Sequence, residues 1–322
     1  MNPKRLLACL CAAGLSSFAL VSAPAVADAT NVTVRGYLTG AYQVTDEEAF
    51  YLAEPHHSGI NTDGSDHGSK FGLNIQGVIS DSIFATAQFH SASAEDDYNT
   101  FLDWAFVTLN LNNNAALRAG KVKYDGALYS SVIDIGNLYP WIELPSYAYA
   151  ESEGSVHGNH ESFNGASLLY TMNSGDMTYS IDLYGGSIGE EEEVFRKRLH
   201  GVTVTVNWDD KVIFKANTNT SKLKADPDSM LDVVNFPELQ FIDGNHHKIT
   251  NFGIKVDWNN VVANIESFDV DWEDFKEHNA ESTYAIVGYR FGKFLPHATV
   301  ASIEKGDPAT PADVMEEMRI PE

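Results

Sequence analysis

Charged side chains recur in the middle of segments in which apolar and polar residues alternate. They are Arg35, Lys70, Arg118, Lys215, Lys255, Glu266 and Arg290. Successive side chains of a β-strand point to opposite faces, so such a segment has one apolar face and one polar, charged face. Charges on the wall of a water-filled passage attract or repel ions and orient polar solutes. A polar face with these charges in mid-strand is therefore compatible with a water-filled lumen.

The alternation that positions these charges predicts β-strands. It is clear over 32–43, 70–79, 201–208 and 251–258. In 201–208, for example, Val202, Val204, Val206 and Trp208 oppose Thr203, Thr205 and Asn207. A soluble β-sandwich shows the same alternation, so the pattern predicts an all-β chain without deciding between water and membrane.

The connections between strands alternate between short and long. Short polar turns are expected at Asp81-Ser82, Asn112–Asn114, Ser174–Asp176, Asp209-Asp210, Asn259-Asn260 and Gly292-Lys293. Longer irregular stretches are expected near 45–68, 91–99, 122–161, 186–197, 218–247 and 269–281. Tight turns at one end and long loops at the other are typical of an antiparallel transmembrane β-barrel, which is the predicted fold.

Aromatic residues precede three of the short turns. Trp208, Trp258 and Phe291 therefore lie at one end of the sheet, on its apolar face. An aromatic girdle at a membrane interface produces this arrangement, which favours the barrel. The alternative is three hydrophobic residues that close ordinary hairpins.

The first residues have the pattern of a cleaved secretory signal. Lys4 and Arg5 are followed by an apolar stretch from Leu6 to Val21 and by the small residues Ala25-Val26-Ala27. The predicted signal peptide is 1–27. Both cysteines of the chain, Cys9 and Cys11, fall inside it, so no disulfide is expected in the mature protein.

The acidic composition excludes one large class of partners. The formal charge is −24, and removal of Lys4 and Arg5 with the signal lowers it by two to −26. Nucleic-acid binding needs a basic face and is not expected. Most of the acidic residues lie in the predicted loops, where they could share divalent cations with lipopolysaccharide phosphates.

The succession of hairpins is unbroken from about 32 to 304, which favours one barrel domain over 28–304.

Three segments resemble parts of the Gram-negative outer-membrane porin superfamily. Leu117–Lys121 resembles the strand end that leads into the third extracellular loop, and Leu138–Trp141 resembles the aromatic-proline stretch of that loop. Phe163–Tyr170 resembles the strand that follows. The resemblance implies a 16-stranded barrel of general-diffusion type, a homotrimer and an outer-membrane location. It also implies that 122–161 folds inward and narrows the channel. The alternative is a loop that covers the outer rim.

The predicted pore-lining and constriction residues combine the wall charges with charges of this loop. They are Arg35, Lys70, Arg118, Lys123, Asp125, Asp134, Glu143, Lys215, Lys255, Glu266 and Arg290. The loop also contains the aromatic residues Tyr124, Tyr129, Tyr139 and Trp141. A connection of this length without strands is usually functional.

The C-terminal part departs from the family pattern. We count about 13 strands, the last near 296–304, whereas bacterial single-chain barrels have an even number. Pro308–Met318 is not strand-like, so 305–322 is expected to be a tail outside the barrel. Either the strands are miscounted or about three closing strands are missing. A truncated or frameshifted product is the favoured explanation.

Motifs that resemble enzyme sites are weak. Gly185–Gly189 matches the nucleophile-elbow pattern around Ser187, but the charged run after it does not fit the buried helix that the elbow requires. His157–Glu161 has the wrong order for a zinc-protease helix, and loop histidines such as His246 and His247 are more often hydrated than metal-bound. No enzyme activity, cofactor or metal is expected.

The sequence thus predicts passive diffusion of small hydrophilic solutes and ions through a water-filled channel. Two alternatives keep the barrel: a non-conducting surface barrel for envelope structure or partner binding, and a truncated, non-functional porin. A third is a soluble exported β protein that binds carbohydrate.

Overall fold

A computed structural model describes most of the chain between Asn31 and Lys305. The described ranges are 31–42, 68–94, 97–141, 144–149, 162–188, 194–225, 244–273 and 279–305, with the single positions 44, 62, 64 and 66. The predicted signal peptide, Glu143 and residues 306–322 lie outside them. Lys305, which was expected to begin the tail, instead ends the last strand.

Thirteen strands make up nearly all of the regular structure that is described. They are β1 (Val32–Thr39), β2 (Lys70–Val78), β3 (Ile83–Ala94), β4 (Asp97–Asn110), β5 (Ala115–Lys123), β6 (Ser162–Ser174), β7 (Met177–Ile188), β8 (Val194–Trp208), β9 (Val212–Ala225), β10 (His246–Trp258), β11 (Val261–Trp272), β12 (Ala280–Tyr289) and β13 (His297–Lys305). Two short helices, η2 (Gly136–Leu138) and α2 (Ser146–Tyr149), lie between β5 and β6.

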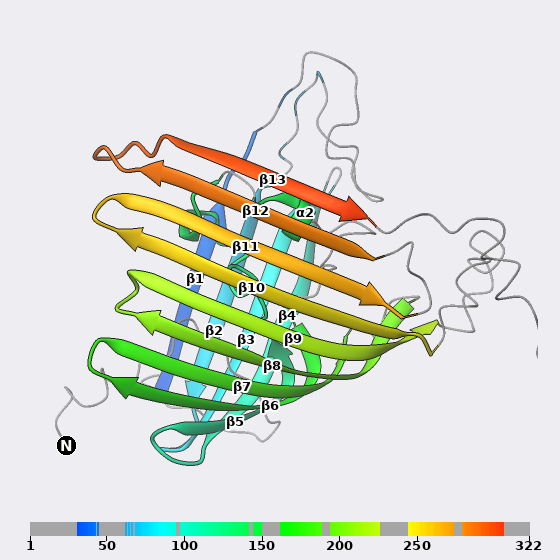
Figure 1. Cartoon of the computed structure of the whole chain (residues 1–322). Helices are drawn as coiled ribbons and strands as arrows, with labels where there is room; N and C mark the ends of the chain where they lie inside the picture. The colour runs from blue at the N-terminus through cyan, green and yellow to red at the C-terminus, as the bar shows by residue number, and fades with distance from the viewer. Residues whose placement is uncertain are drawn as a thin grey trace, which may run out of the picture. The chain divides into compact units, whose positions relative to one another are not determined.

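The strands form one sheet in sequence order, from β1 to β13, and Figure 1 traces this meander from blue to red. The pairings with a defined register are antiparallel, such as Ile254 with Ile265 across β10 and β11. Among the described strands no pairing joins β1 to β13. The prediction of an all-β antiparallel chain with about 13 strands is confirmed. Within the described residues, no helix is long and apolar enough to cross a membrane.

The chain divides into two compact units, which are described separately. The first contains β1 to β6, β7 as far as Asp182, and Tyr129–Leu144. The second contains β7 from Leu183, β8 to β13, Gly126–Leu128 and α2. Both Tyr129–Leu144 and Gly126–Leu128 belong to the connection between β5 and β6.

The six short turns lie where the sequence predicts them. Between β10 and β11, Asn259 and Asn260 have φ of 50° and 68°. Two consecutive positive φ angles are typical of the type I′ hairpin turn, and asparagine tolerates them better than most residues. Gly175 and Gly292, with φ of 59° and 62°, allow the same region in two other turns.

The strands extend further toward the long-loop end than the sequence predicts. Residues 91–99 were expected to be irregular, but β3 runs to Ala94 and β4 begins at Asp97. Likewise β10 begins at His246 and β11 runs to Trp272. On β11 the alternation continues to the strand end with the faces exchanged: Phe268 and Val270 are buried, whereas Asp269 and Asp271 are exposed. Backbone pairing continues as well, for example between Lys248 and Asp271. A search for one continuous apolar face therefore underestimates the length of these strands.

The two faces of the sheet differ in the way that a membrane strand requires. We call them the apolar face and the polar face. On β10, Phe252 of the apolar face is 43% exposed and its neighbour Asn251 is 1% exposed. On β11, Ile265 is 48% exposed and Glu266 is 0% exposed. In the first unit Leu38 is 83% exposed, whereas Gln88 of the polar face is buried. Large apolar residues outside and polar residues inside are the reverse of a soluble core.

Candidate functional site

The connection between β5 and β6 is bound to the polar face of the sheet in the first unit. Lys70 Nζ on β2 donates a hydrogen bond of 3.1 Å to Asp134 Oδ1 of the connection. His90 Nδ1 on β3 lies 3.3 Å from the other carboxylate oxygen of Asp134 and 2.7 Å from the hydroxyl of Tyr37 on β1. Asp134 is itself buried. A loop carboxylate is therefore held by side chains of two neighbouring strands, and Tyr37 of a third strand contacts one of these side chains.

Aromatic side chains give this part of the connection a core of its own. Tyr129 is fully buried and packs edge-on against Tyr139 and Trp141, with ring centroids 6.1 and 5.8 Å away. The hydroxyl of Tyr139 donates a hydrogen bond of 3.0 Å to the carbonyl oxygen of Ile133. Edge-to-face aromatic pairs contribute about 0.5–1.5 kcal/mol each beyond burial. The segment is thus internally packed as well as bound to the strands.

Glu266 binds the connection to the polar face in the second unit. Its Oε1 accepts hydrogen bonds from the backbone N–H of Leu128 at 2.7 Å and from Asn251 Nδ2 at 3.2 Å. Its Oε2 accepts from the hydroxyl of Tyr284 at 2.7 Å and from the hydroxyl of Tyr149. Burying a carboxyl group is costly unless its oxygens are hydrogen-bonded, and here both are. Two of the four donors belong to the connection.

Two further contacts bring Gly126–Leu128 against the same face. Lys215 Nζ on β9 donates a hydrogen bond of 3.0 Å to the carbonyl oxygen of Ala127. Gly253 on β10 has no side chain to obstruct the approach, since a Cβ there would lie 2.6 Å from Leu128 Cγ and 3.0 Å from Glu266 Oε1. Glycine within a strand often marks a close approach of this kind.

A second group of charges lies on the polar face of β3 to β7. Arg118 Nε donates a hydrogen bond of 3.0 Å to Ser167 Oγ, and its guanidinium also pairs with Asp182. Lys123 Nζ lies 3.4 Å from the centroid of the Trp104 ring, a cation–π contact. An irregularity in the pairing of β3 with β4 leaves Asp103 as an extra residue, and Asp103 accepts a 2.9 Å hydrogen bond from Gln88.

A third group lies near the short-turn end of the second unit. Arg290, just after β12, donates hydrogen bonds from its two terminal guanidinium nitrogens to the carboxylate of Asp257 on β10. Nη2 lies 2.6 Å from Oδ2. The hydrogen bonds that Arg290 donates to the carboxylate of Asp257 raise the pKa of Arg290 above its ordinary value. Lys255 lies two residues before Asp257 on the same face and is half-buried. Bidentate pairs of this kind are the stronger ion pairs.

The structure brings some of the predicted residues together and separates others. Lys70 meets Asp134, while Lys215 and Glu266 both contact Gly126–Leu128. Arg35 is exposed on β1, Asp125 is half-buried in the connection, and Glu143 lies outside the described residues. Nothing in the sequence singles out the residues that pair with these charges: His90, Asp103, Tyr149, Asp182, Asn251, Asp257 and Tyr284. The period-two pattern already placed Asn251 and Asp257 on the polar face, but nothing in it indicates which groups they contact.

The predicted aromatic residues lie at the short-turn end of the second unit. The rings of Trp208 and Trp258 are 5.5 Å apart, and Lys211 Nζ lies 5.6 Å from the Trp208 ring. Phe291 is 62% exposed, and its ring lies 4.8 Å from that of Tyr289.

The enzyme-like motifs have no matching geometry where they are described. Ser187 lies inside β7, so it is not at the strand-to-helix turn that a nucleophile elbow requires. His246 is exposed and His247 is buried on the opposite face of β10, so the two rings cannot share one metal ion. Among the described residues, no three histidine, cysteine, aspartate or glutamate side chains are grouped as metal ligands would be.

Comparisons with known proteins give a likeness in structure but not in sequence. No family model matches the chain. No curated protein matches it in sequence. OmpF of Salmonella typhi, solved in complex with daunomycin, is 13% identical with a TM-score of 0.53, over 85% of this chain and 79% of that one.

Two other solved structures are less similar. OmpT of Vibrio cholerae, an outer-membrane protein lacking its loop L8, is 11% identical with a TM-score of 0.49, over 85% of this chain and 82% of that one. The anion-selective porin from Comamonas acidovorans is 13% identical with a TM-score of 0.42, over 87% and 91%. At these TM-scores neither adds to the argument. The likeness to OmpF, together with the all-β meander, shows that the chain has the fold of the porin-like outer-membrane β-barrels.

Proposed function

We propose that this protein is an outer-membrane channel through which small hydrophilic solutes and ions diffuse passively. The support is the combination of a porin-like fold with an exposed apolar face and a polar face that carries paired charges. A lipid-facing exterior and a hydrated interior both follow from this division. No solute is transformed, and neither a cofactor nor a metal takes part.

The constriction in this proposal is the connection 122–161. The observation that carries it is the set of contacts that bind described parts of this connection to the polar face. They include Asp134 with Lys70 in the first unit and Leu128 with Glu266 in the second. A segment on the hydrated face narrows the passage, and its carboxylates face basic wall residues. Selectivity then follows from the width of the passage and from these charges.

The remaining parts of the proposal concern the protein's surroundings. A signal peptide over 1–27 directs export, and the mature protein lies in the outer membrane as a homotrimer. Trp208, Trp258 and Phe291 form its aromatic girdle at the short-turn side. Lipopolysaccharide is its neighbour at the long-loop side.

Conductance across a planar lipid bilayer tests the proposal. The purified protein should give discrete channel openings, and deletion of 128–152 should raise the conductance of each opening. This deletion removes Asp134 and Tyr149 together with their contacts to the strands. Openings of unchanged size would mean that the connection does not narrow the channel.

One observation favours a second candidate, a non-conducting surface barrel. The described polar face is largely covered: Lys215 is 5% exposed, Asn251 1% and Glu266 0%. A protein that shows heat-modifiable migration after detergent extraction but gives no openings would be this second kind. Absence of heat-modifiable migration would instead indicate the soluble exported protein.

A further inference from the structure

Basic side chains lie at the long-loop end of the second unit, on the side of the sheet that carries the apolar face. Lys248 and Trp258 are ten residues apart on β10, and an even separation places them on the same side. For a strand tilted by roughly 40°, this separation is about 26 Å along the membrane normal. Trp258 belongs to the predicted aromatic girdle, and the apolar band of such barrels is about 25 Å tall. Lys248 therefore lies at the height of the lipid headgroups on the long-loop side.

The register of three strands brings further cations beside Lys248. Lys197 on β8 is directly opposite Lys222 on β9, and Lys222 is directly opposite His246 on β10. Lys222 and Lys248 are then diagonal neighbours, a relation that places residues about 7–8 Å apart. Lys197 and Lys248 are exposed, and Lys222 is half-buried. The long side chains of such neighbours can reach one shared anion.

An irregularity in β8 adds one more exposed cation. The register shifts between Lys197 and His200, where β8 has one residue more than β9. Bulges of this kind re-aim a side chain. Here Arg198 is exposed, while Leu199 is buried on the opposite side. Arg198 has a φ of 53°, in a region that is unfavourable for residues other than glycine. We call Lys197, Arg198, Lys222 and Lys248 the basic group.

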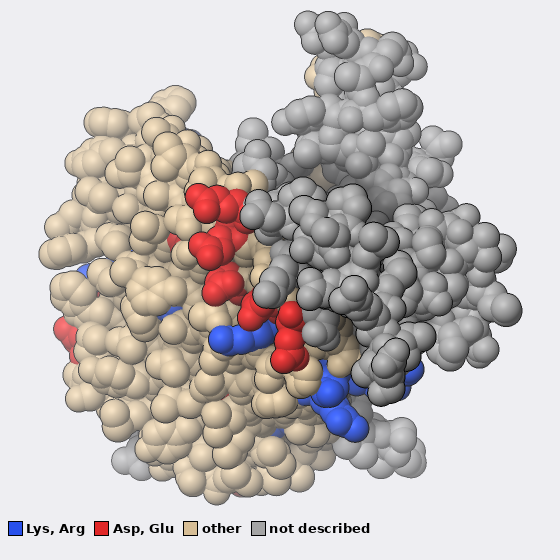
Figure 2. All heavy atoms as spheres, turned by 45° about the vertical axis from the view of Figure 1, so that its right-hand side comes forward, with Lys and Arg blue, Asp and Glu red and all other residues tan. Residues whose placement is uncertain are grey.

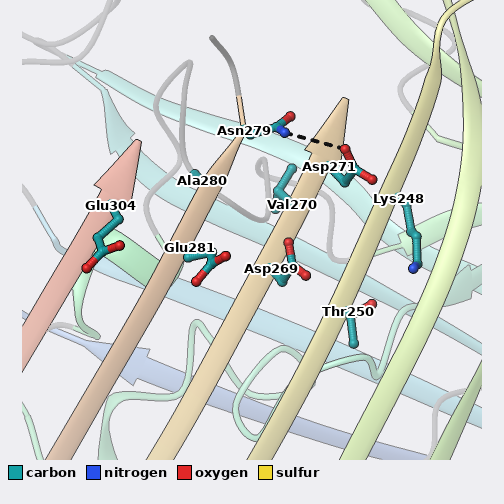
Figure 3. A pocket seen from close by; sticks show the side chains of 9 residues that line it. All are labelled: Lys248, Thr250, Asp269, Val270, Asp271, Asn279, Ala280, Glu281 and Glu304. Atoms are coloured by element: carbon teal, nitrogen blue, oxygen red, sulfur yellow. Dashed lines mark hydrogen bonds between the residues drawn. The ribbon is translucent and has the colours of Figure 1, made fainter. Parts of the chain in front are cut away.

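Acidic residues bound the basic group on the side of β11. Asp271 is directly opposite Lys248, but its carboxylate accepts a hydrogen bond of 3.4 Å from Asn279, as Figure 3 shows. Glu273 lies 4.0 Å from His246. Figure 2 shows basic side chains next to a line of acidic ones on the surface. The outward charge at the long-loop end is thus positive on β8 to β10 and negative beyond them.

The basic group fits a ligand that is anionic at one end and apolar at the other. Among the described residues neither Lys222 nor Lys248 has an ion pair. Like charges directly opposite each other, such as Lys197 and Lys222, are destabilising unless an anion offsets them. Nearer the short turns, on the same side, Phe252 is 43% exposed and its ring lies 4.9 Å from that of Phe214. Cations therefore lie directly above an apolar surface.

We propose that the basic group binds the phosphate group of an anionic lipid in the leaflet on the long-loop side. The acyl chains of this lipid lie against Phe252 and the apolar face below. Lysine and arginine near a membrane surface attract anionic lipids, and their hydrogen bonds to phosphate are charge-assisted. The contact is direct and needs no divalent cation. This inference rests on the membrane location in the proposed function and does not depend on solute passage.

Lipid titration of the full chain in detergent, followed by native mass spectrometry, tests the proposal. The probes are dioleoylphosphatidic acid and dioleoylphosphatidylcholine, which share their acyl chains but differ in headgroup charge. EDTA is present throughout, so that divalent cations cannot bridge carboxylates to phosphate. Phosphatidic acid should bind about 25-fold more tightly, at about five-fold for each of Lys222 and Lys248. Added salt should reduce this preference, because exposed charges are screened.

Two matched double variants locate the binding. Lys222→Gln/Lys248→Gln should lose the preference for phosphatidic acid. Lys211→Gln/Lys293→Gln removes the same charge at the short-turn end and should keep the preference to within about two-fold, because the basic group is intact. Heat-modifiable migration checks that each variant folds. Equal losses in the two variants would contradict a site at the basic group.

A measurement on the unaltered chain decides even if the variants do not fold. Acetylation by N-hydroxysuccinimidyl acetate should slow at Lys222 and Lys248 with phosphatidic acid but not with phosphatidylcholine. Equal protection by both lipids, equal protection by glycerol 3-phosphate, or a preference that appears only with calcium would each overturn the proposal. None of these measurements involves conductance, so a lack of channel openings would count against solute passage alone.

Discussion

The backbone N–H of Leu128 lies 2.7 Å from Oε1 of Glu266, a residue 138 positions later in the chain. This hydrogen bond joins the connection between β5 and β6 to the polar face of β11. Lys215, Asn251 and Tyr284 complete the surroundings from three further strands. A single buried carboxyl group therefore holds a segment whose position decides how wide the proposed channel is.

Replacing Glu266 should release this segment. In Glu266→Ala the N–H of Leu128 and the hydroxyl of Tyr149 lose their acceptor, at a cost of about 1–3 kcal/mol for each hydrogen bond. The expected results are larger and noisier single-channel openings and faster hydrogen exchange at 126–128. Asp257→Asn, which changes another polar-face acid that binds Arg290 and not the connection, serves as the control. Equal effects of the two substitutions would contradict a specific anchoring role.

Adding one methyl group at Gly253, which is directly opposite Glu266 on the neighbouring strand, should displace the same segment by steric overlap. The new Cβ would lie 2.6 Å from Leu128 Cγ, and overpacking of this kind costs about 1–3 kcal/mol. Gly253→Ala should raise conductance while the strands stay intact by circular dichroism. Gly77→Ala is the matched control, because its nearest neighbour would be 4.0 Å away. A normal conductance for Gly253→Ala would show that Leu128 can move without widening the channel.

An arginine substitution should destabilise the protein much more on one face of a strand than on the other. Leu73 of the apolar face and Asn74 of the polar face are neighbours on β2, and Leu73 is 39% exposed. Leu73 lies five residues from the end of β2. For a strand tilted by roughly 40°, this places it about 13 Å from the turn, measured along the membrane normal. It is therefore near the middle of an apolar band about 25 Å tall. Leu73→Arg should therefore destabilise the protein in lipid vesicles by about 2–4 kcal/mol. Asn74→Arg should cost far less, as measured by urea unfolding. Similar losses would contradict the assignment of the faces.

The channel should prefer cations weakly, and more so at low salt. Several basic residues of the wall are locally paired: Lys70 with Asp134, Arg118 with Asp182 and Arg290 with Asp257. The formal net charge of −24 becomes about −26 when the signal peptide is lost. This net negative charge then dominates the mouth of the channel and enriches cations there. Exposed charges are screened beyond about 10 Å at 0.1 M salt, so the preference should shrink or reverse as salt rises. Reversal potentials across a salt gradient, at two mean concentrations, measure this. Anion preference at low salt would mean that the basic wall residues dominate.

Removing one carboxylate from the polar face should shift the ion selectivity of the channel toward anions. Asp134→Asn removes one negative charge from the polar face, and the ammonium group of Lys70 loses its ion pair with that carboxylate. Reversal potentials should move toward anions relative to the unaltered protein. Asp209→Asn is the control, because Asp209 lies in an exposed turn and pairs only with Lys211 among the described residues. The prediction is wrong if both substitutions move the potential equally.

The sequence by itself determined the class of fold, the strand order and the faces. Period two assigns Leu73 and Asn74, or Ile265 and Glu266, to opposite sides, because strand geometry alone decides this. Turn chemistry located the short connections, since Asn259-Asn260 and Gly175 suit positive φ angles. These properties are local, so each can be inferred from a few neighbouring residues.

Only the tertiary structure decided which polar groups meet and how far the strands extend. Glu266 appears in the sequence as one charge among several on a polar face. Its four donors come from residues 128, 149, 251 and 284, whose proximity depends on the register of β10 to β12 and on the path of a long connection. The extra length of β3, β4, β10 and β11 was missed for a related reason. Backbone hydrogen bonds between strands do not depend on which face is apolar, so pairing continues where apolar and charged residues exchange faces, as at Phe268–Trp272 of β11.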